Sequence, residues 1–212
     1  MKRVTPRPPT LAPRPFPSAP YNAWPMRILA DESKMTRLID GLAGAIEADK
    51  SSVHDSGNWA IVGIRSRGDV LARRLAERVP IDHVGTLDIT LYRDDLSEIG
   101  PQAVVRTTEI DFSIDGLQVV LVDDVLMTGR SVRAALQSLM DLGRPRRVWL
   151  SVLVDRGGRE LPIQPDHVAL DLSRSDSDGR LGEGEHVDVL IRPTDDRDAI
   201  LVRAAAAKGS VT

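Results

Sequence analysis

The sequence predicts an α/β protein built on a mostly parallel, doubly wound β-sheet. Three observations favour this fold class. Short apolar segments alternate along the chain with longer segments of helical periodicity, which is typical of parallel strands joined by helices. Residues 119–122 are uniformly β-branched or apolar, as in strands buried on both faces. Charged and hydroxyl residues follow these strands, and ligands of such sheets bind at the carboxyl ends of the strands.

The first half of the chain contains two expected helices and three expected strands. Hydrophobic periodicity predicts a helix over residues 31–48, a buried strand over 59–64 and a helix over 68–79. Residues 86–92 alternate between apolar and polar side chains, which predicts a half-buried strand. We expect a loop of about 17 residues to follow, leading to a polar strand near residues 103–110.

The second half begins with the most hydrophobic strand. Gly116 predicts a turn into the strand at 119–122, and a helix is expected from about Ser131, because apolar residues recur at helical spacing after it. Another strand is expected at 148–154. Weaker strands are expected at 168–170, 187–191 and 200–202.

Length and composition limit the class of protein. A chain of 212 residues with 42% hydrophobic content is expected to fold as one domain with a substantial core. The absence of cysteine excludes disulfides, thiolate zinc sites and a cysteine nucleophile. No apolar run approaches the roughly 20 residues that cross a bilayer, and no signal peptide pattern opens the chain. We therefore expect a cytoplasmic protein that does not engage membranes.

Charge is distributed unevenly along the chain. Residues 1–25 contain four basic residues, no acidic residue and eight of the 14 prolines, which predicts an extended or disordered arm. Because the whole chain carries −3 and this arm +4, residues 26–212 carry −7, a charge that is not typical of a nucleic-acid-binding domain. The expected organisation is the arm at 1–25, one folded domain at 26–205 and a tail at 206–212.

The strand at 119–122 leads into a candidate anion site. Two carboxylates, Asp123 and Asp124, follow the strand, and Thr128, Gly129 and Ser131 precede the next helix. A strand, a hydroxyl-rich loop and a helix N-terminus together favour phosphate binding, because unpaired backbone N–H groups and the positive end of the helix dipole face the anion. The adjacent carboxylates suit ribose hydroxyls or a hydrated Mg²⁺. In the alternative interpretation the two aspartates only cap the following helix. Capping alone does not require Thr128, Gly129 and Ser131 to occur together, which favours the anion site.

Two further clusters follow the ends of expected strands. Ser66 and Arg67 lie at the start of the helix expected at 68–79 and predict a second anion site. A positive arginine at a helix N-terminus is unfavourable because of the helix dipole, and a bound anion would offset this. The alternative is a basic turn that is only solvated. Arg93 opens the long loop and is a candidate to cover the bound anion and exclude water, the alternative being a surface turn.

The segment at 119–131 resembles the phosphoribosyl diphosphate (PRPP) signature of type I phosphoribosyltransferases, in which two acidic residues precede a Thr-Gly loop. Together with residues 62–68, 88–96 and 152–162 it is similar to the PyrR family of pyrimidine-operon attenuation regulators, which are also uracil phosphoribosyltransferases. The resemblance runs from roughly Ile28 to Val168. It implies a type I phosphoribosyltransferase fold with a small hood, conversion of uracil and PRPP to UMP and diphosphate, a homodimer or higher oligomer, and regulation through binding of pyr leader messenger RNA.

The same resemblance implies roles for individual residues. Asp123 and Asp124 are expected to contact the ribose hydroxyls, with Arg93 as a third catalytic residue, and Mg²⁺ is expected to bind through PRPP and waters rather than directly to the protein. The residues expected to contact PRPP or UMP are Ser66, Arg67, Arg93, Asp123, Asp124, Val125, Leu126, Met127, Thr128, Gly129, Arg130, Ser131 and Arg156.

Two departures from the family pattern leave three hypotheses open. The family's Lys-Asn-x-Pro-Thr-Ser hood loop is replaced at residues 170–175 by Leu-Asp-Leu-Ser-Arg-Ser, and residues 38–49 of the first helix contain no Lys or Arg. The favoured hypothesis is an active uracil phosphoribosyltransferase. The alternatives are an RNA-binding regulator that keeps the pocket as a nucleotide sensor, and a phosphoribosyltransferase for another base. The four histidines have no metal-ligand spacing and are expected to be structural or on the surface.

Overall fold

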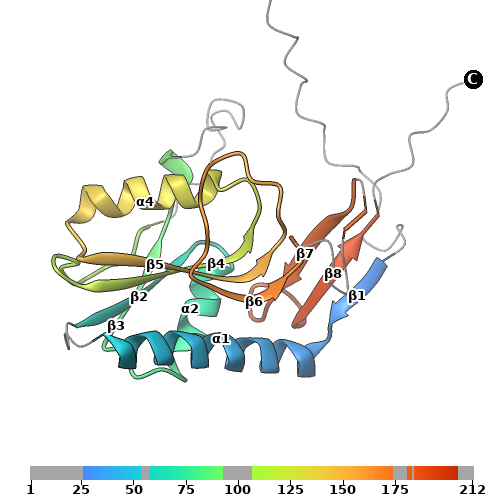
Figure 1. Ribbon diagram of the computed structural model, residues 1–212, viewed down its shortest axis with the longest axis horizontal. Coiled ribbons are helices and arrows are strands. Elements are labelled where there is room, and N and C mark those ends of the chain that lie inside the picture. The colour runs from blue at the N-terminus through green and yellow to red at the C-terminus, as the bar shows by residue number, and fades with distance from the viewer. Residues whose placement is uncertain (1–25, 54–57, 93–106, 174–180, 183, 205–212) are drawn as a thin grey trace, which may run out of the picture.

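The buried apolar segments form the central layer of an α/β fold (Figure 1). The computed structural model describes residues 26–53, 58–92, 107–173, 181–182 and 184–204. The expected arm and tail, Arg93 and most of the expected strand at 103–110 therefore lie outside the described residues. The strands are β1 (Met26–Ala30), β2 (Trp59–Ile64), β3 (His83–Leu87), β4 (Gln118–Leu126), β5 (Arg147–Asp155), β6 (His167–Asp171), β7 (His186–Leu190) and β8 (Ala199–Arg203). The helices are α1 (Glu32–Ser52), α2 (Gly68–Ala76) and α4 (Arg130–Leu142), with a 3₁₀ turn, η1, at Thr90–Tyr92.

The main sheet has five strands in the order β3-β2-β4-β5-β6, and each neighbouring pair is parallel. Helices α1 and α2 cover one face and α4 covers the other (Figure 1). The sheet is therefore doubly wound, as predicted. The chain leaves β2 toward β3 and leaves β4 toward β5, so its winding direction reverses between β2 and β4. Ligands of doubly wound sheets bind at such a reversal point.

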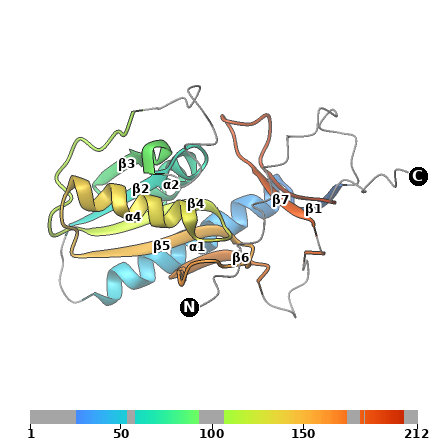
Figure 2. The same cartoon turned by 90° about the horizontal axis from the view of Figure 1, so that it is seen from above.

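A second, antiparallel sheet of β1, β8 and β7 forms a small hood. It lies beside the main sheet, on the side toward which the carboxyl ends of β4 and β5 point (Figures 1 and 2). The strand β1 was not expected from the sequence. Only Ala30 of its five residues is buried, so the segment lacks a clear period, and its partner β8 is about 170 residues away along the chain.

Two of the strand predictions were wrong in position. The strand expected at 86–92 is β3 at His83–Leu87, because Asp88 ends it: Asp88 Oδ1 accepts hydrogen bonds from Thr90 N (2.8 Å) and Thr90 Oγ1 (2.6 Å). The strand expected at 119–122 extends to Leu126, so that Asp123 and Asp124 lie inside β4 rather than directly after it. Of the strand expected near 103–110, the described part makes a single bridge between Glu109 and Thr86.

Candidate functional site

The loop after β4 has the geometry predicted for a phosphate-binding turn. Gly129, the N-cap of α4, has φ +88°, a left-handed conformation that glycine adopts without penalty. Thr128 Oγ1 accepts a hydrogen bond from Arg130 N at 3.3 Å, and the Thr128 carbonyl accepts from the backbone N–H groups of Glu160 (3.0 Å) and Leu161 (3.1 Å). The loop is therefore held by its own threonine and by the segment after β5, with the N-terminus of α4 directed to the end of the sheet.

The aspartates at the end of β4 form an adjacent pair of carboxylates, of which Asp123 is buried and Asp124 half-buried. Asp123 is 7% exposed, and its Oδ1 accepts a hydrogen bond from the backbone N–H of Asp124 at 2.9 Å. Asp124 Oδ1 accepts from the backbone N–H of Val125 at 2.9 Å. Burial, together with the neighbouring charge of Asp124, raises the pKa of Asp123 well above its ordinary value. Burial also raises the pKa of Asp124, although hydrogen bonding and the charge of Arg67 oppose this shift.

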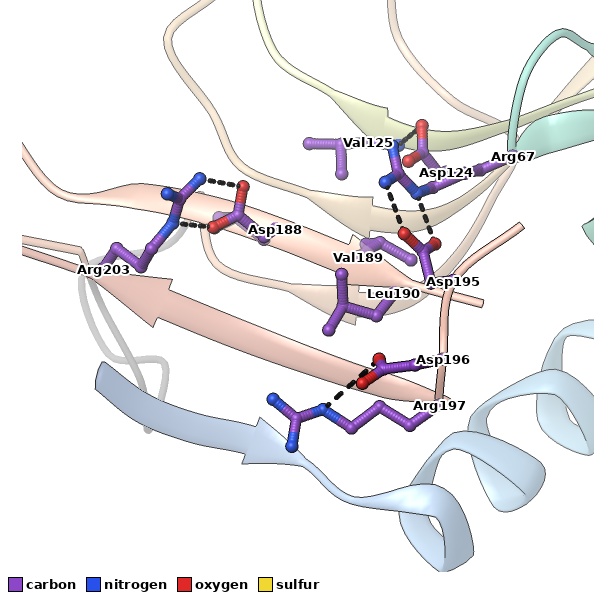
Figure 3. Close-up of a pocket in the computed structure, with 11 residues that line it drawn as sticks. Arg67, Asp124, Val125, Asp188, Val189, Leu190, Asp195, Asp196, Arg197 and Arg203 are labelled. Atoms are coloured by element: carbon purple, nitrogen blue, oxygen red, sulfur yellow. Dashed lines mark hydrogen bonds and ion pairs between the residues drawn. The ribbon is translucent and has the colours of Figure 1, made fainter. Parts of the chain in front are cut away.

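The segment between β2 and α2 presents two arginines near these carboxylates. The peptide bond between Arg65 and Ser66 is cis, and Arg67 is the N-cap of α2. Arg65 makes an ion pair with Glu109 at 3.1 Å. Arg67 donates from Nε and Nη2 to the two carboxylate oxygens of Asp195 in the hood, both at 2.9 Å (Figure 3). One arginine is thus tied toward the edge of the main sheet and the other toward the hood.

Two glycines allow α2 to approach the sheet closely. A Cβ atom on Gly68 would lie 2.5 Å from the Val122 carbonyl oxygen, and one on Gly63 would clash with the backbone of Gly68 and Asp69. Any other residue would push the start of α2 away from β2 and β4. The glycines therefore keep the arginine segment next to the carboxylates.

A cavity of about 230 Å³ lies between the two loops. Six of its lining residues were predicted from the sequence, namely Ser66, Arg67, Asp123, Asp124, Val125 and Ser131. Ile64 and Arg65 complete the lining. Segments about 60 residues apart in the chain therefore meet at the reversal point of the sheet, where the fold class predicts a ligand.

A second cavity, of about 760 Å³, adjoins the first and lies under the hood (Figure 3). The two cavities share Arg67, Asp124 and Val125. The hood contributes the rest of the lining, which is mostly charged: Val187, Asp188, Val189, Leu190, Asp195, Asp196, Arg197 and Arg203. Within it Arg203 makes a two-point ion pair with Asp188. The sequence analysis missed these residues, although the acidic turn at residues 195–198 between two expected strands was a signal for them.

Several predicted residues do not line either cavity in this structure. Leu126 is 1% exposed and packs in the core, and Met127 is 41% exposed. Arg130 makes an ion pair with Glu160 at 2.7 Å. Arg156 donates to the Glu185 carbonyl at 2.7 Å and to Met127 Sδ. Thr128 and Gly129 shape the loop through backbone contacts.

The carboxylates around the two cavities fit a cation that takes most of its ligands from the substrate and from water rather than from the protein. Among the described residues no group of three or more His, Cys, Asp or Glu side chains converges on one point. Asp123 and Asp124 nevertheless form a pair of adjacent carboxylates, and burial raises the pKa of each. Mg²⁺ prefers oxygen ligands and commonly binds through one or two carboxylates plus substrate phosphates and waters. The residues present therefore fit Mg²⁺ brought by a phosphorylated substrate.

Within the described part of the chain, no helix is long and apolar enough to span a membrane.

Comparison with known proteins gives consistent results. The sequence profile of a family described as "Phosphoribosyl transferase domain" matches residues 27–180. "Bifunctional protein PyrR" of Thermus thermophilus is 54% identical over 169 residues, covering 76% of this chain and 90% of the relative. The protein of the same name from Pelotomaculum thermopropionicum is 48% identical over 156 residues, covering 71% of this chain and 82% of the relative.

Solved structures support the fold. The hypoxanthine phosphoribosyltransferase of Trypanosoma cruzi matches with a TM-score of 0.56 at 18% identity, over 85% of this chain and 97% of that one. A hypoxanthine-guanine phosphoribosyltransferase from Bacillus anthracis matches with a TM-score of 0.53 at 16% identity, over 69% of this chain and 84% of that one. At these identities the similarity shows a shared fold.

Proposed function

The chain belongs to the phosphoribosyltransferase family and, within it, to the PyrR proteins, and from this premise we propose that it converts uracil and PRPP to UMP and diphosphate. One structural observation supports the proposal above all others. The two anion-binding loops meet around one cavity at the reversal point of the sheet, and that cavity adjoins a larger one under the hood. PRPP carries a 5-phosphate and a 1-diphosphate on one ribose, so that its site requires two anion-binding loops with room for a base beside them.

The proposed roles follow from this arrangement. Backbone N–H groups in the loop from Thr128 to Ser131 bind the 5-phosphate at the N-terminus of α4. Asp123 and Asp124 contact the ribose hydroxyls from the end of β4. The segment at 65–67 binds the diphosphate, whose negative charge Arg67 balances. The hood cavity receives the base.

Displacement at the anomeric carbon is expected to develop oxocarbenium character, as in glycoside chemistry. The reaction then requires no nucleophile from the protein. Catalysis comes from positioning the base against the sugar and from stabilising charge on the departing diphosphate. Asp123 and Asp124 also present their negative charge to the ribose ring as positive charge develops there. For Arg93 we propose a contact with the departing diphosphate.

We propose Mg²⁺ as the cofactor, bound through PRPP oxygens and waters with Asp123 and Asp124 nearby. Bound there, the ion neutralises diphosphate charge and so improves the leaving group. The carboxylates of the chain orient the ribose and balance the charge of the complex. The side chains of Leu126, Met127, Arg130 and Arg156 are proposed to support the loop around PRPP rather than to contact it.

The relatives are named bifunctional, and a second, regulatory function is proposed on that basis. In it the chain binds pyr leader messenger RNA in response to uridine nucleotides, as a homo-oligomer. The folded part of the chain starts at about residue 26 and ends near 205 in this proposal, and the flanking segments are not needed for catalysis.

A base panel tests the proposed reaction. The chain is incubated with Mg²⁺ and PRPP together with uracil, hypoxanthine or guanine, and the product is identified by mass. We expect UMP from uracil, and a purine nucleotide as main product would favour the hypothesis of another base. PRPP with Mg²⁺ should also raise the melting temperature, because it binds the native state alone. If millimolar PRPP left the melting temperature unchanged and no base gave a product, both the proposed PRPP binding and the proposed reaction would be contradicted.

A further inference from the structure

The turn between β7 and β8 is held against α2 by two matched ion pairs. Arg67 and Arg74 are seven residues apart, which places them on the same side of α2. Each makes a two-point contact with an aspartate of the turn: Arg67 with Asp195, and Arg74 with Asp198. These two pairs join segments more than 120 residues apart and connect the hood to the main sheet.

The two pairs differ in their relation to the site. Arg67 and Asp195 both line the cavity under the hood, and Arg67 also lines the smaller cavity, whereas Arg74 and Asp198 line neither. Arg74 Nη2 also donates to the Arg192 carbonyl at 2.9 Å. The Arg74 pair is therefore an anchor for the turn, and the Arg67 pair lies at the boundary between the two cavities.

The carboxylate of Asp195 is fixed by the backbone of its own turn. Its Oδ2 accepts a hydrogen bond from the Ile191 N–H at 2.9 Å, and the Asp195 N–H donates to the Ile191 carbonyl at 2.9 Å. Ile191 itself is 1% exposed. A fixed acceptor with two oxygens matches the two parallel N–H groups of a guanidinium, so it determines the direction of a long side chain that otherwise samples many rotamers.

The negative charge of Asp124 at the end of β4 also acts on Arg67. The hydrogen bonds to Asp195 raise the pKa of Arg67, and the negative charge of Asp124 contributes in the same direction. The guanidinium thus lies between a carboxylate of the hood and a carboxylate at the end of β4. Loss of the Asp195 contact would leave Asp124 as the remaining carboxylate partner near the guanidinium, and Arg67 would no longer be held toward the hood.

Resting on the proposed function, we propose that Asp195 is a positioning residue: it fixes the direction of the Arg67 guanidinium, which lies between the hood and Asp124, at the diphosphate end of the site. Asp195 acts on the diphosphate through Arg67 and does not contact the diphosphate itself. In this arrangement the hood, which receives the base, also sets the geometry of the diphosphate-binding segment. The two halves of the site are therefore coupled by one ion pair.

Asp195→Asn tests the proposal, with Asp198→Asn as the matched control. Both changes remove one carboxylate charge from the same turn and from the same kind of ion pair. The measurements are kcat and KM for PRPP, the affinity for inorganic diphosphate with Mg²⁺ by calorimetry, and the melting temperature. We expect Asp195→Asn to raise the KM for PRPP and the Kd for diphosphate roughly fivefold, with a smaller change in kcat. Asp198→Asn is expected to lower the melting temperature and to leave the KM for PRPP and the Kd for diphosphate unchanged.

A double-mutant cycle separates positioning from general damage. If Asp195 acts through Arg67, Asp195→Asn should have no further effect on diphosphate affinity in an Arg67→Ala background. Asp195→Glu, which keeps the charge but displaces it by one methylene, should weaken diphosphate binding in the same direction and serves if the Asn variant does not fold. Additive effects in the cycle, unchanged binding in Asp195→Asn, or an equal loss in Asp198→Asn would each overturn the proposal. Absence of nucleotide product from the unmodified chain would instead refute the proposed function, because diphosphate binding tests Asp195 without a base.

Discussion

At the end of β4, Asp123 is buried and Asp124 beside it is half-buried, and placing two carboxylates there reduces the stability of the free protein. Each carboxylate accepts a hydrogen bond from the backbone N–H of the next residue, and burial raises both pKa values. Charged groups are buried at such a cost mainly where binding or catalysis uses them. In the proposed function the cost is offset when substrate and Mg²⁺ bind.

The first prediction concerns Asp124. Asp124→Asn keeps the shape of the side chain and its acceptor for the Val125 N–H, but removes the charge proposed to face the ribose. We expect kcat/KM for PRPP to fall by about 100-fold or more, with the melting temperature unchanged or higher. Steady-state kinetics and thermal melts on the same preparation check this. A folded variant with full activity would remove Asp124 from the proposed site.

The second prediction concerns the pH dependence of stability through Asp123. Because the pKa of Asp123 is raised in the folded state, the folded protein holds its proton more tightly than the unfolded chain does. The free energy of unfolding therefore falls as pH rises from about 4 through the folded pKa. Asp123→Asn removes this loss, so the variant should melt at a higher temperature than the unmodified protein at pH 7, and the difference should shrink toward pH 4.

Asp155 provides the control for this measurement. It is as buried as Asp123, but Arg159 pairs with it at 2.6 Å and the Gly157 N–H donates to it at 2.9 Å. Asp155→Asn leaves Arg159 without its charged partner and should lower stability at pH 7 by about 1–3 kcal/mol. If both variants lost stability at pH 7, uncompensated charge would not be the property that distinguishes Asp123.

At the scale of elements, helix α2 determines where the diphosphate-binding segment lies. Its start is pressed against β4, because Gly68 leaves no room for a side chain between its own Cα and the Val122 carbonyl. Helix α1 contains glycines under no such constraint. Nothing lies within 4 Å of a Cβ placed on Gly44, in the middle of that helix.

The third prediction compares these two glycines. Gly68→Ala should destabilise the fold by about 1–3 kcal/mol through overpacking and should weaken diphosphate binding, since residues 65–67 must move with the helix. Gly44→Ala should stabilise it by up to about 1 kcal/mol, because alanine is the better helix former. Denaturant unfolding and diphosphate calorimetry on both variants test this. A Gly68→Ala variant with unchanged affinity would show that the close contact does not position the loop.

The regular elements could largely be predicted from hydrophobic periodicity. The expected strand at 59–64 agrees with β2, the helix from about Ser131 with α4 at Arg130–Leu142, and the weaker strands with β6, β7 and β8. One error occurs where a side chain overrides the pattern. Asp88 caps a turn and ends β3 despite the alternation that continues to Tyr92. The buried histidine His167 is structural, as expected, since it bonds Ser151 and Asp49.

At the scale of the whole molecule, the half of the candidate site in the main sheet could be predicted and the half in the hood could not. Residues 65–67 and 123–131 belong to local motifs, in which each loop adjoins the strand and helix that position it. Asp195 enters the site only because β7 and β8 pair with β1 and because Arg67 reaches across 128 positions of the chain. The acidic turn at residues 195–198 marks a candidate segment, but its contact with Arg67 depends on the assembled fold.

The fourth prediction concerns the proposed RNA function and the distribution of charge over the whole chain. Residues 26–212 carry −7, and α1 contains only Lys34, Arg37 and Lys50 as basic residues. Phosphate contacts dominate RNA affinity, and each one steepens the dependence of log K on log salt by nearly one unit. We therefore expect deletion of residues 1–25 to remove most RNA binding and to flatten its salt dependence, while PRPP-dependent turnover stays unchanged.

A second variant separates the charge of these residues from their length. Replacement of Lys2, Arg3, Arg7 and Arg14 by Gln keeps all 25 residues and removes their four positive charges. If charge is responsible, this variant should lose RNA affinity as the deletion does, in gel-shift titrations at several salt concentrations. Tight binding of leader RNA by the truncated chain, strengthened by UMP, would place the RNA contact on residues 26–212 instead. Regulation would then depend on a local basic surface that the net charge of the domain conceals.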